Sequence, residues 1–352
     1  RTQMTMPNFT IITPGGCNAK CDFCTDDMNR PASKDYILNL AKAISQLPAE
    51  YRQVSISGGE PTISPEFMTI LWLIKASSRF DKVVLTTNGT KLHKYIDQLD
   101  GLVDHINLSR HAIGYDPNMR IFGTKAIPKD DEIVVMVDKL NRMGIDVNLN
   151  HVYSDADAHE VTERGDSYVT KFANYAKELG ASSVAFRYDQ NPNNLAETYL
   201  EREMFDLGYK IVNEGGCPSC RSHTHIVRGL PVMMKASLAE PKLVMGKEIY
   251  ELIYHIDGRL CSDWAGDLEF DPKTGTVIER VKETQPASDV LQAVIENPIV
   301  ATPTTTIIEK IQDKVERREI VKRDFHTSVV PDPSKVIVMG SCSGFGSFRC
   351  GS

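Results

Sequence analysis

Three of the eight cysteines lie within eight residues of one another near the N-terminus. The run Cys17-Asn-Ala-Lys-Cys21-Asp-Phe-Cys24 directly follows a strand-like stretch, so one loop carries all three thiols. Three thiolates can hold three irons of a [4Fe–4S] cubane, and the fourth iron then lacks a protein ligand and can bind a substrate. Closely spaced cysteines also suit Zn²⁺, but structural zinc sites are closed by four ligands and this loop has no His. The loop therefore favours iron–sulfur over zinc.

A second motif, Ser57-Gly58-Gly59-Glu60-Pro61, lies at the end of the next strand-like stretch. Its two glycines leave the strand backbone without Cβ atoms, so the amino group of a ligand can approach carbonyls that a side chain would shield. Two such motifs at the ends of adjacent strands arise by chance far less often than either one alone.

Together the two motifs resemble those of the radical S-adenosylmethionine (SAM) superfamily. The Cys-x3-Cys-x2-Cys loop with an aromatic residue, Phe23, before its last Cys resembles that superfamily's cluster loop, and Gly58 to Pro61 match its Gly-Gly-Glu-Pro motif. The resemblance covers about residues 8–190. It implies a [4Fe–4S] cluster on the three cysteines and reductive cleavage of SAM to methionine and a 5′-deoxyadenosyl radical. It also implies a low-potential electron donor, flavodoxin or ferredoxin.

The resemblance further implies a SAM site at the carboxyl ends of the strands, where barrel enzymes place their chemistry. Phe23 would cover the adenine face, and Ser109 together with Asn148 or Asn150 would bind the ribose or carboxylate. Arg110 would grip that carboxylate bidentately. For each, the alternative is a structural role in packing or in capping the barrel. The predicted cofactor-binding residues are Phe23, Gly58, Gly59, Glu60, Pro61, Thr87, Asn88, Ser109, Arg110, Asn148 and Asn150. Further candidates for substrate contact are His111, His151, Arg187 and Tyr188.

Strand-like and helix-like patterns alternate from Asn8 to about Asp189, which is typical of βα units around a parallel sheet. Strands are expected at Phe9–Thr13, Gln53–Ser57, Lys82–Thr87, His105–Ser109, Asp146–His151 and Ser183–Tyr188. Helices are expected at Lys34–Leu47, Pro65–Ser78, Lys91–Leu99, Asp131–Met143 and Ser167–Leu179.

The pattern changes after about residue 190, so the expected fold class is α/β: a partial (β/α)6 TIM-type barrel with a smaller C-terminal α+β extension. The core is expected over 1–190 and the extension over 191–285, with hairpins around Asp257-Gly258 and Pro272–Gly275. Residues 286–352 are expected to form a charged helical segment and a Gly/Ser-rich tail with two cysteines.

The expected extension has cysteines of its own. Cys217-x2-Cys220, followed by Cys261, is similar to the auxiliary-cluster extensions called twitch or SPASM domains, which implies a second iron–sulfur cluster. The usual further run of cysteines is missing, so a fourth ligand would come from Cys342, Cys350 or the substrate. A zinc or redox pair and reduced thiols in packing are the alternatives.

Composition excludes several classes of protein. The formal net charge of −7 argues against an extended nucleic acid as an obligate partner. The chain has no apolar run long enough for a membrane span and no secretory leader, so a cytoplasmic protein is expected.

Three functions fit the motifs. A radical SAM enzyme that modifies a nucleoside, a nucleotide or another small metabolite is one expectation. It fits an expected N-terminus without a leader-binding domain and a cavity closed by the C-terminal region. A peptide-modifying enzyme suits the twitch-like extension. An iron–sulfur or zinc scaffold without enzymatic activity is the third hypothesis. The Gly-Gly-Glu-Pro motif disfavours it, because metal binding alone does not require this motif.

Overall fold

One long sheet organises the part of the chain that the structure describes, which is residues 7–24, 31–154, 157, 167–188, 196–215, 222–235, 249 and 251–279 of a computed structural model. Its strand order is β13-β12-β11-β10-β1-β2-β3-β4-β5-β6-β9-β8-β7. Cys217, Cys220, the expected helical segment and the expected tail lie outside the described residues.

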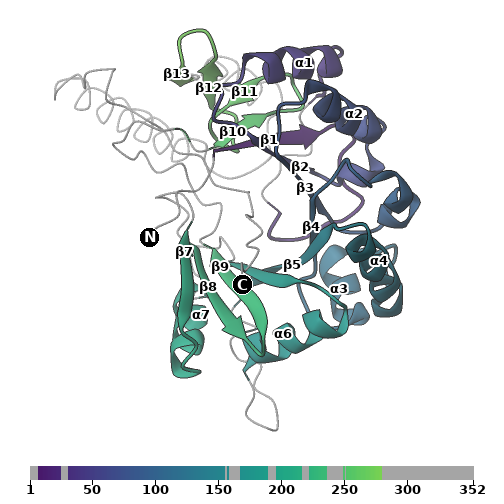
Figure 1. Cartoon of the computed structure of the whole chain (residues 1–352), viewed down its shortest axis with the longest axis vertical. Coiled ribbons are helices and arrows are strands. Elements are labelled where there is room, and N and C mark those ends of the chain that lie inside the picture. The colour runs from purple at the N-terminus through teal and green to yellow at the C-terminus, as the bar shows by residue number, and fades with distance from the viewer. Residues whose placement is uncertain are drawn as a thin grey trace, which may run out of the picture.

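The middle of the sheet is parallel, and its strands alternate with helices along the chain. The strands are β1 (Asn8–Thr13), β2 (Gln53–Gly58), β3 (Lys82–Thr87), β4 (His105–Ser109), β5 (Asp146–Tyr153) and β6 (Ser183–Tyr188). The helices are α1 (Tyr36–Gln46), α2 (Phe67–Ser77), α3 (Tyr115–Phe122), α4 (Asp130–Arg142) and α6 (Tyr168–Glu178). Figure 1 shows these helices along the convex side of the curved sheet, which is the arrangement of a partial barrel. The expected α/β fold class is confirmed.

The two faces of the parallel strands differ in polarity because successive side chains alternate between them. On β2, Val54 and Ile56 are fully buried in the hydrophobic core with the helices, whereas Gln53 and Ser55 face the other way and hydrogen-bond to Asn8. We call the face opposite the helices the inner face. Its polar character leaves a ligand many hydrogen-bonding partners.

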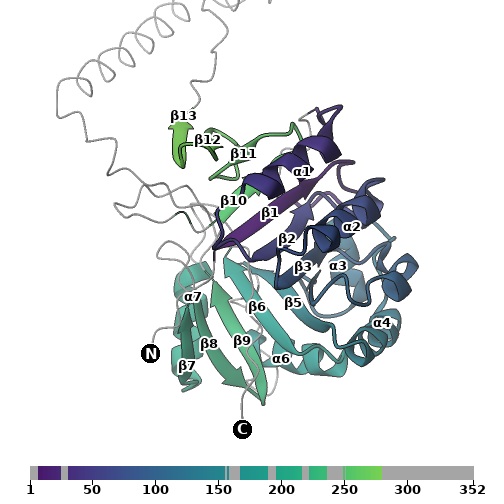
Figure 2. The same ribbon diagram turned by 45° about the horizontal axis from the view of Figure 1, so that its top comes forward.

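The parallel part of the sheet is wider than the sequence indicated. β10 (Glu251–Tyr254) pairs parallel with β1, and β9 (Leu230–Lys235) pairs parallel with β6, so each edge gains one strand from the expected extension. Figure 2 shows both strands continuing the curved sheet. The parallel pairing of β9 was hidden because β9 follows β8 through a hairpin rather than through a helix. The division into three regions stays a prediction.

Antiparallel strands extend both edges. β11 (Leu260–Cys261) and β12 (Leu268–Asp271) continue from β10, and β13 (Thr276–Glu279) pairs with β12, so both expected hairpins are confirmed. At the other edge, β8 (Ser222–Val227) pairs with β9 and with β7 (Ile211–Gly215), which follows α7 (Ala196–Asp206). The described sheet therefore ends in short antiparallel strands at each side and does not close.

One expected helix is absent, and one helix in the structure was not expected. Residues expected to form a helix over 91–99 form two short 3-10 turns, η2 (Leu92–Lys94) and η3 (Ile96–Gln98), and a third turn, η1 (Pro61–Ile63), follows β2. Helix α3 was not expected, because its two turns are too short for a clear apolar stripe. Among the described residues, no helix has the length and apolar character that a membrane span requires.

Helix α1 offers a direct test of the core. Leu40 is fully buried, whereas Leu38 on the same helix is 57% exposed. We expect Leu40→Ala to lower the free energy of unfolding by about 2–5 kcal/mol, since it removes buried methyl groups and leaves a cavity. Leu38→Ala should change it by less than about 0.5 kcal/mol. Denaturant titration of both variants measures the difference, and equal losses would contradict the packing of α1.

Candidate functional site

The three N-terminal cysteines lie on the loop that leaves β1. Cys17 and Cys21 are half-buried and Cys24 is exposed. The loop is held locally, because the Ala19 amide donates to Cys17 Sγ at 3.3 Å and the Cys24 amide donates to the Cys21 carbonyl at 3.0 Å. We call residues 14–24 the cysteine loop.

The thiols of the cysteine loop influence one another. Burial, together with the neighbouring Cys24 and Cys17, raises the pKa of Cys21 to about 12. Burial also raises the pKa of Cys17, with contributions from Glu60 and Cys24. A cationic group that binds thiolates would remove this mutual repulsion, because ligand cysteines must give up their protons.

The donor set of this loop, three thiols, suits an iron–sulfur cubane. In the described part of the chain, no three His, Cys, Asp or Glu side chains converge closely enough to hold one metal ion. Thiolates that bind three different irons need not meet at one point. Cys17, Cys21 and Cys24 are therefore the residues that would hold the cluster.

Glu60 joins the ends of two strands. Its Oε1 accepts hydrogen bonds from the Thr62 amide (3.0 Å), the Thr62 hydroxyl (2.6 Å) and the Thr87 hydroxyl (2.6 Å), and its Oε2 accepts from the Asn88 amide at 2.6 Å. Burial raises the pKa of Glu60, and these donors oppose that rise. The carboxylate is thus a bridge between the turn after β2 and the end of β3.

The same turn also contacts the cysteine loop. The Glu60 amide donates to the Gly16 carbonyl at 2.9 Å. A Cβ on Gly59 would lie 2.0 Å from that oxygen and 3.0 Å from the Cys17 nitrogen, which no packing tolerates. From the sequence, glycine at 59 is expected because it lets a ligand approach the strand backbone. The structure adds a second reason, the close approach of the cysteine loop.

Asn88, predicted to bind SAM, contacts the cysteine loop. Its Nδ2 donates to Asn18 Oδ1 at 2.9 Å and lies 4.0 Å from Cys17 Sγ, and Asn18 Nδ2 donates to Thr90 at 2.9 Å. The end of β3 therefore holds the first half of the loop.

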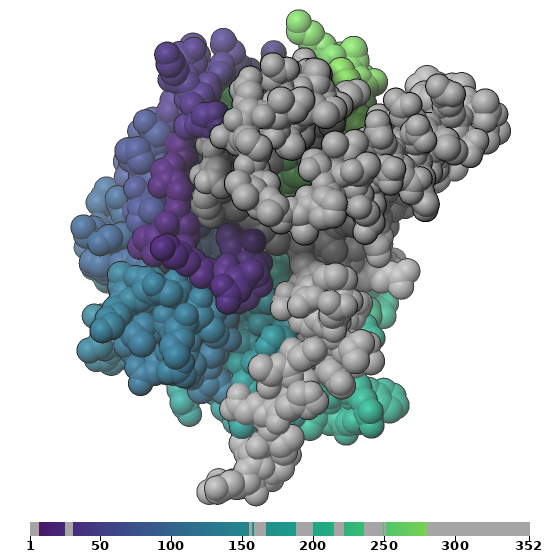
Figure 3. Space-filling view, turned by 180° about the vertical axis from the view of Figure 1, so that it is seen from behind, coloured from purple at the N-terminus to yellow at the C-terminus, as the bar shows by residue number. Residues whose placement is uncertain are grey.

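The second half of the cysteine loop packs on α3. The Lys20 amide donates to the Phe122 carbonyl at 2.9 Å, and the Phe23 ring meets the His111 ring edge-on at a centroid distance of 4.7 Å. In the space-filling view of Figure 3, purple N-terminal residues lie against blue residues from the middle of the chain. Since Phe23 lies between two of the cysteines, α3 and His111 help to set the shape of the loop.

The other predicted SAM contacts fall on two different faces. Ser109 and Asn150 are neighbours in register on the inner face, and both are half-exposed. Asn148 is fully buried there and is already used: it donates to Asn107 and Asn150 and accepts from Ser183. We therefore expect Asn150 rather than Asn148 to offer free donors to a ligand.

Arg110 faces away from the inner face. Its guanidinium donates to the carbonyls of Ser109 (2.8 Å), Pro128 (3.2 Å) and Asn88 (3.3 Å), and its side chain is almost fully buried. These bonds tie the ends of β3 and β4 to the segment before α4. A bidentate grip on a ligand carboxylate stays a prediction, and it would compete with these three contacts.

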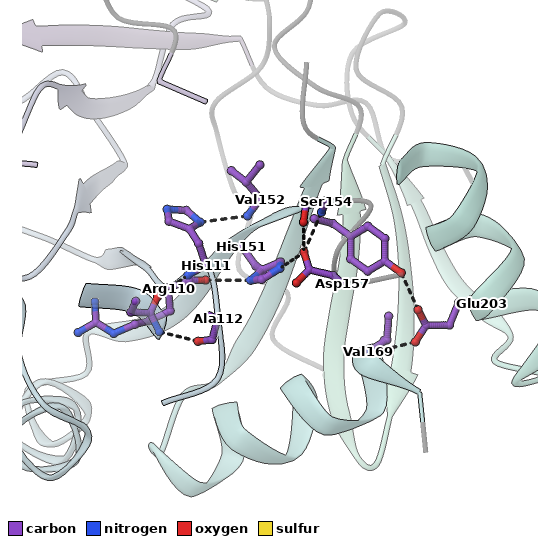
Figure 4. A network of polar contacts seen from close by, with 11 residues as sticks. Arg110, His111, Ala112, His151, Val152, Ser154, Asp157, Val169 and Glu203 are labelled. Atoms are coloured by element: carbon purple, nitrogen blue, oxygen red, sulfur yellow. Dashed lines mark hydrogen bonds and ion pairs between the residues drawn. The ribbon is translucent and has the colours of Figure 1, made fainter. Parts of the chain in front are cut away.

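A buried histidine network joins the segment after β4 to β5 and Asp157 (Figure 4). His111 Nδ1 accepts from the Val152 amide at 3.1 Å, while His151 lies 3.1 Å from the Arg110 carbonyl and 3.2 Å from Asp157. Burial raises the pKa of Asp157, but the hydrogen bonds from His151 and Ser154 outweigh it and hold the pKa below its usual value. The ring of His111 is held by the Val152 amide of β5, and this ring packs against Phe23.

In the C-terminal part, Cys261 is fully buried on β11, and burial raises its pKa to about 12. Trp264, which could stack on a planar substrate, is half-buried. The auxiliary cluster on Cys217, Cys220 and Cys261 stays a prediction, because the first two lie outside the described residues.

The comparisons with known proteins agree with the motifs. A family model described as "Radical SAM superfamily" matches residues 11–160. A GTP 3',8-cyclase of Actinobacillus pleuropneumoniae is 34% identical over 102 residues, which are 26% of this chain and 29% of the relative. A probable GTP 3',8-cyclase of Saccharolobus solfataricus is 30% identical over 188 residues, which are 51% of this chain and 56% of the relative. The chain thus spans about a third to a half of the curated relatives it matches.

Among solved structures, Streptococcus suis SuiB bound to precursor peptide SuiA aligns at a TM-score of 0.49 and 13% identity, over 74% of this chain and 59% of SuiB. The Escherichia coli coproporphyrinogen III oxidase HemN aligns at a TM-score of 0.41 and 10% identity, over 63% and 66% of the two chains.

The close approach of Gly59 to Gly16 yields a prediction for iron binding. We expect Gly59→Ala to push the Gly16-Cys17 backbone away and to weaken cluster binding by about 10- to 100-fold, as is typical when the support of a metal ligand is lost. Chelator competition after anaerobic reconstitution measures this.

The matched control is Gly144→Ala. Gly144 has a left-handed backbone, with φ +77°, which Gly59 does not, but an added Cβ at Gly144 would meet nothing within 4 Å. That variant should lose only about 1 kcal/mol of stability and keep its iron. Unchanged iron affinity in Gly59→Ala would contradict the proposed contact between the turn and the loop.

Glu60 yields a second prediction. Glu60→Gln replaces one of two carboxylate oxygens, which together accept four hydrogen bonds, with an NH₂ group that cannot accept. At least one buried donor then faces another donor, so we expect a loss of about 1–3 kcal/mol in the free energy of unfolding. Glu66→Gln, at the start of α2, removes a half-exposed carboxylate that receives no side-chain bond from its helix and should be nearly neutral. If Glu60→Gln left the free energy of unfolding unchanged, Glu60 would not be the bridge between the ends of β2 and β3.

Proposed function

Residues 11–160 belong to the radical SAM superfamily, and from this we propose that the protein is an enzyme that cleaves SAM reductively and abstracts a hydrogen atom from a substrate. The observation that carries the proposal is the contact between the two motifs, where the amide of Glu60 donates to the carbonyl of Gly16 at 2.9 Å. A metal-binding scaffold would not require the Gly-Gly-Glu-Pro turn against its cysteine loop.

In this proposal Cys17, Cys21 and Cys24 hold a [4Fe–4S] cluster. When bound, the cluster supplies the low-potential electron that cleaves SAM to methionine and a 5′-deoxyadenosyl radical. We infer that flavodoxin or ferredoxin delivers this electron.

The chain's own contribution is to position SAM and to exclude water. The backbone of Gly58 and Gly59 would receive the amino group of SAM, while Phe23, fixed by the ring of His111, would cover its adenine. Ser109, the last residue of β4, and Asn150 on β5 are neighbours on the inner face, and their polar groups would bind the ribose or carboxylate. Holding both reactants in this way supplies proximity and orientation.

For the substrate we propose a nucleoside, a nucleotide or another small metabolite. The inner face supports this choice because amide and hydroxyl groups line it, as on Asn107, Asn150 and Ser183. The curated relatives named GTP 3',8-cyclase are consistent with a nucleotide, although this chain spans only part of them. Comparison of small metabolites and peptides in cells with and without the protein decides the class, and a modified peptide would overturn this choice.

Cysteine variants test the chemistry. We expect Cys17→Ala, Cys21→Ala and Cys24→Ala each to lose the absorption near roughly 400 nm that a thiolate-bound cubane gives. The reduced, reconstituted variants should also release no 5′-deoxyadenosine from SAM.

Cys261→Ala is the comparison variant for SAM cleavage, because the buried thiol of Cys261 on β11 is predicted only for an auxiliary cluster and not for the cluster that cleaves SAM. That variant should still cleave SAM. If wild-type protein released no 5′-deoxyadenosine, the enzymatic proposal would fail, and the scaffold hypothesis would remain.

A further inference from the structure

Two cationic side chains stand next to each other on the inner face. Arg187 on β6 and Lys235 on β9 are direct partners in the parallel register. Their neighbours along each strand, Phe186 and Met234, are buried in the hydrophobic core, so alternation directs Arg187 and Lys235 to the opposite, inner face. Like charges opposite each other on adjacent strands are destabilising.

Lys235 is directed into the protein rather than into bulk water. Its side chain is only 4% exposed. Its charge also acts on β4: burial, together with the charges of Lys82 and Lys235, lowers the pKa of His105 to about 3. Lys235 therefore lies within electrostatic range of a residue three strands away across the inner face.

The position of the pair suits a ligand that reaches the cysteine loop. Arg187 and Lys235 lie at or near the carboxyl ends of β6 and β9, and these strands run parallel to β1, from whose carboxyl end the cysteine loop leaves. Ligands of parallel sheets bind beyond these strand ends. Between the pair and the loop, Ser109 and Asn150 supply polar groups on the same face.

The chemistry of the pair is that of an anion site. A guanidinium offers a planar fork of donors and an ammonium a compact charge, and both bind carboxylate and phosphate oxygens by charge-assisted hydrogen bonds. The chain as a whole carries a formal charge of −7, so an anion would need a local positive field to enter.

We propose that Arg187 and Lys235 bind an oxyanion of the substrate, either a carboxylate or a phosphate. This inference rests on the proposed function, because it takes the inner face as the substrate site. Both side chains have other interactions in the structure, and the inference depends on their charge and placement alone.

The test measures binding of two simple probes, inorganic pyrophosphate and citrate, to the full-length reconstituted protein by calorimetric titration. Wild-type protein should bind one of them, and the preferred probe distinguishes phosphate from carboxylate. Lys235→Met and Arg187→Met should each weaken that binding at least about tenfold, as loss of a hydrogen bond to a charged group does. Lys42→Met, at an exposed position on α1, should bind as wild type does.

A second measurement does not depend on the folding of any variant. Binding of the preferred probe to wild-type protein should weaken as salt rises from low ionic strength, because ions screen the charges of the site. Salt-independent binding, binding of neither probe, or unchanged binding in both variants would overturn the anion site.

The proposed function can fail separately. If wild-type protein binds pyrophosphate or citrate with the expected variant pattern but releases no 5′-deoxyadenosine from SAM, then the anion site stands and the radical chemistry is wrong. If SAM is cleaved and neither probe binds, the enzymatic proposal stands and the anion site is wrong.

Discussion

The buried carboxylate of Glu60 is the interaction on which the candidate site depends. Its two oxygens accept hydrogen bonds from the turn after β2 and from the end of β3, and the amide of the same residue reaches the carbonyl of Gly16. Glu60 thus joins the three segments that follow β1, β2 and β3 at the carboxyl ends of these strands. A buried carboxylate is tolerated only when donors surround it, and here Thr62, Thr87 and Asn88 supply them. The contacts of the cysteine loop with Asn88 and with α3 further hold it in place.

Much of the parallel core could be predicted from the sequence. The six expected strands occur with bounds that differ by at most two residues, because runs rich in Val, Ile and Leu, separated by amphipathic helices, leave few alternatives. The edge strands β9 and β10 could not be predicted as parallel partners. Their pairing is decided by packing of residues such as Val232 and Leu252 against distant parts of the core, not by local pattern.

The candidate site could be located from sequence, but the roles of single residues could not. Spacing identified the cysteine loop and the turn at Gly58 to Pro61, and both lie together in the structure. Arg110 was expected to face a ligand, yet one residue of alternation places it on the helix side, where backbone carbonyls surround its guanidinium. His111 was a weak candidate, since a lone histidine carries no pattern. Its contact with Phe23 depends on α3, a helix too short to be expected.

The docking of the cysteine loop on α3 has a consequence for the order of events during synthesis. The amide of Lys20 is held by the carbonyl of Phe122, which the ribosome adds only after β1 to β4 have been made. Closing the long segment between these two residues has an entropic cost, so we expect this contact to form after the intervening chain has folded. We therefore expect the thiols of the cysteine loop to reach their final arrangement late. Delivery of iron and sulfide would then follow the folding of the first half of the sheet, and a chain released before Phe122 would present its cysteines without the shape that holds them.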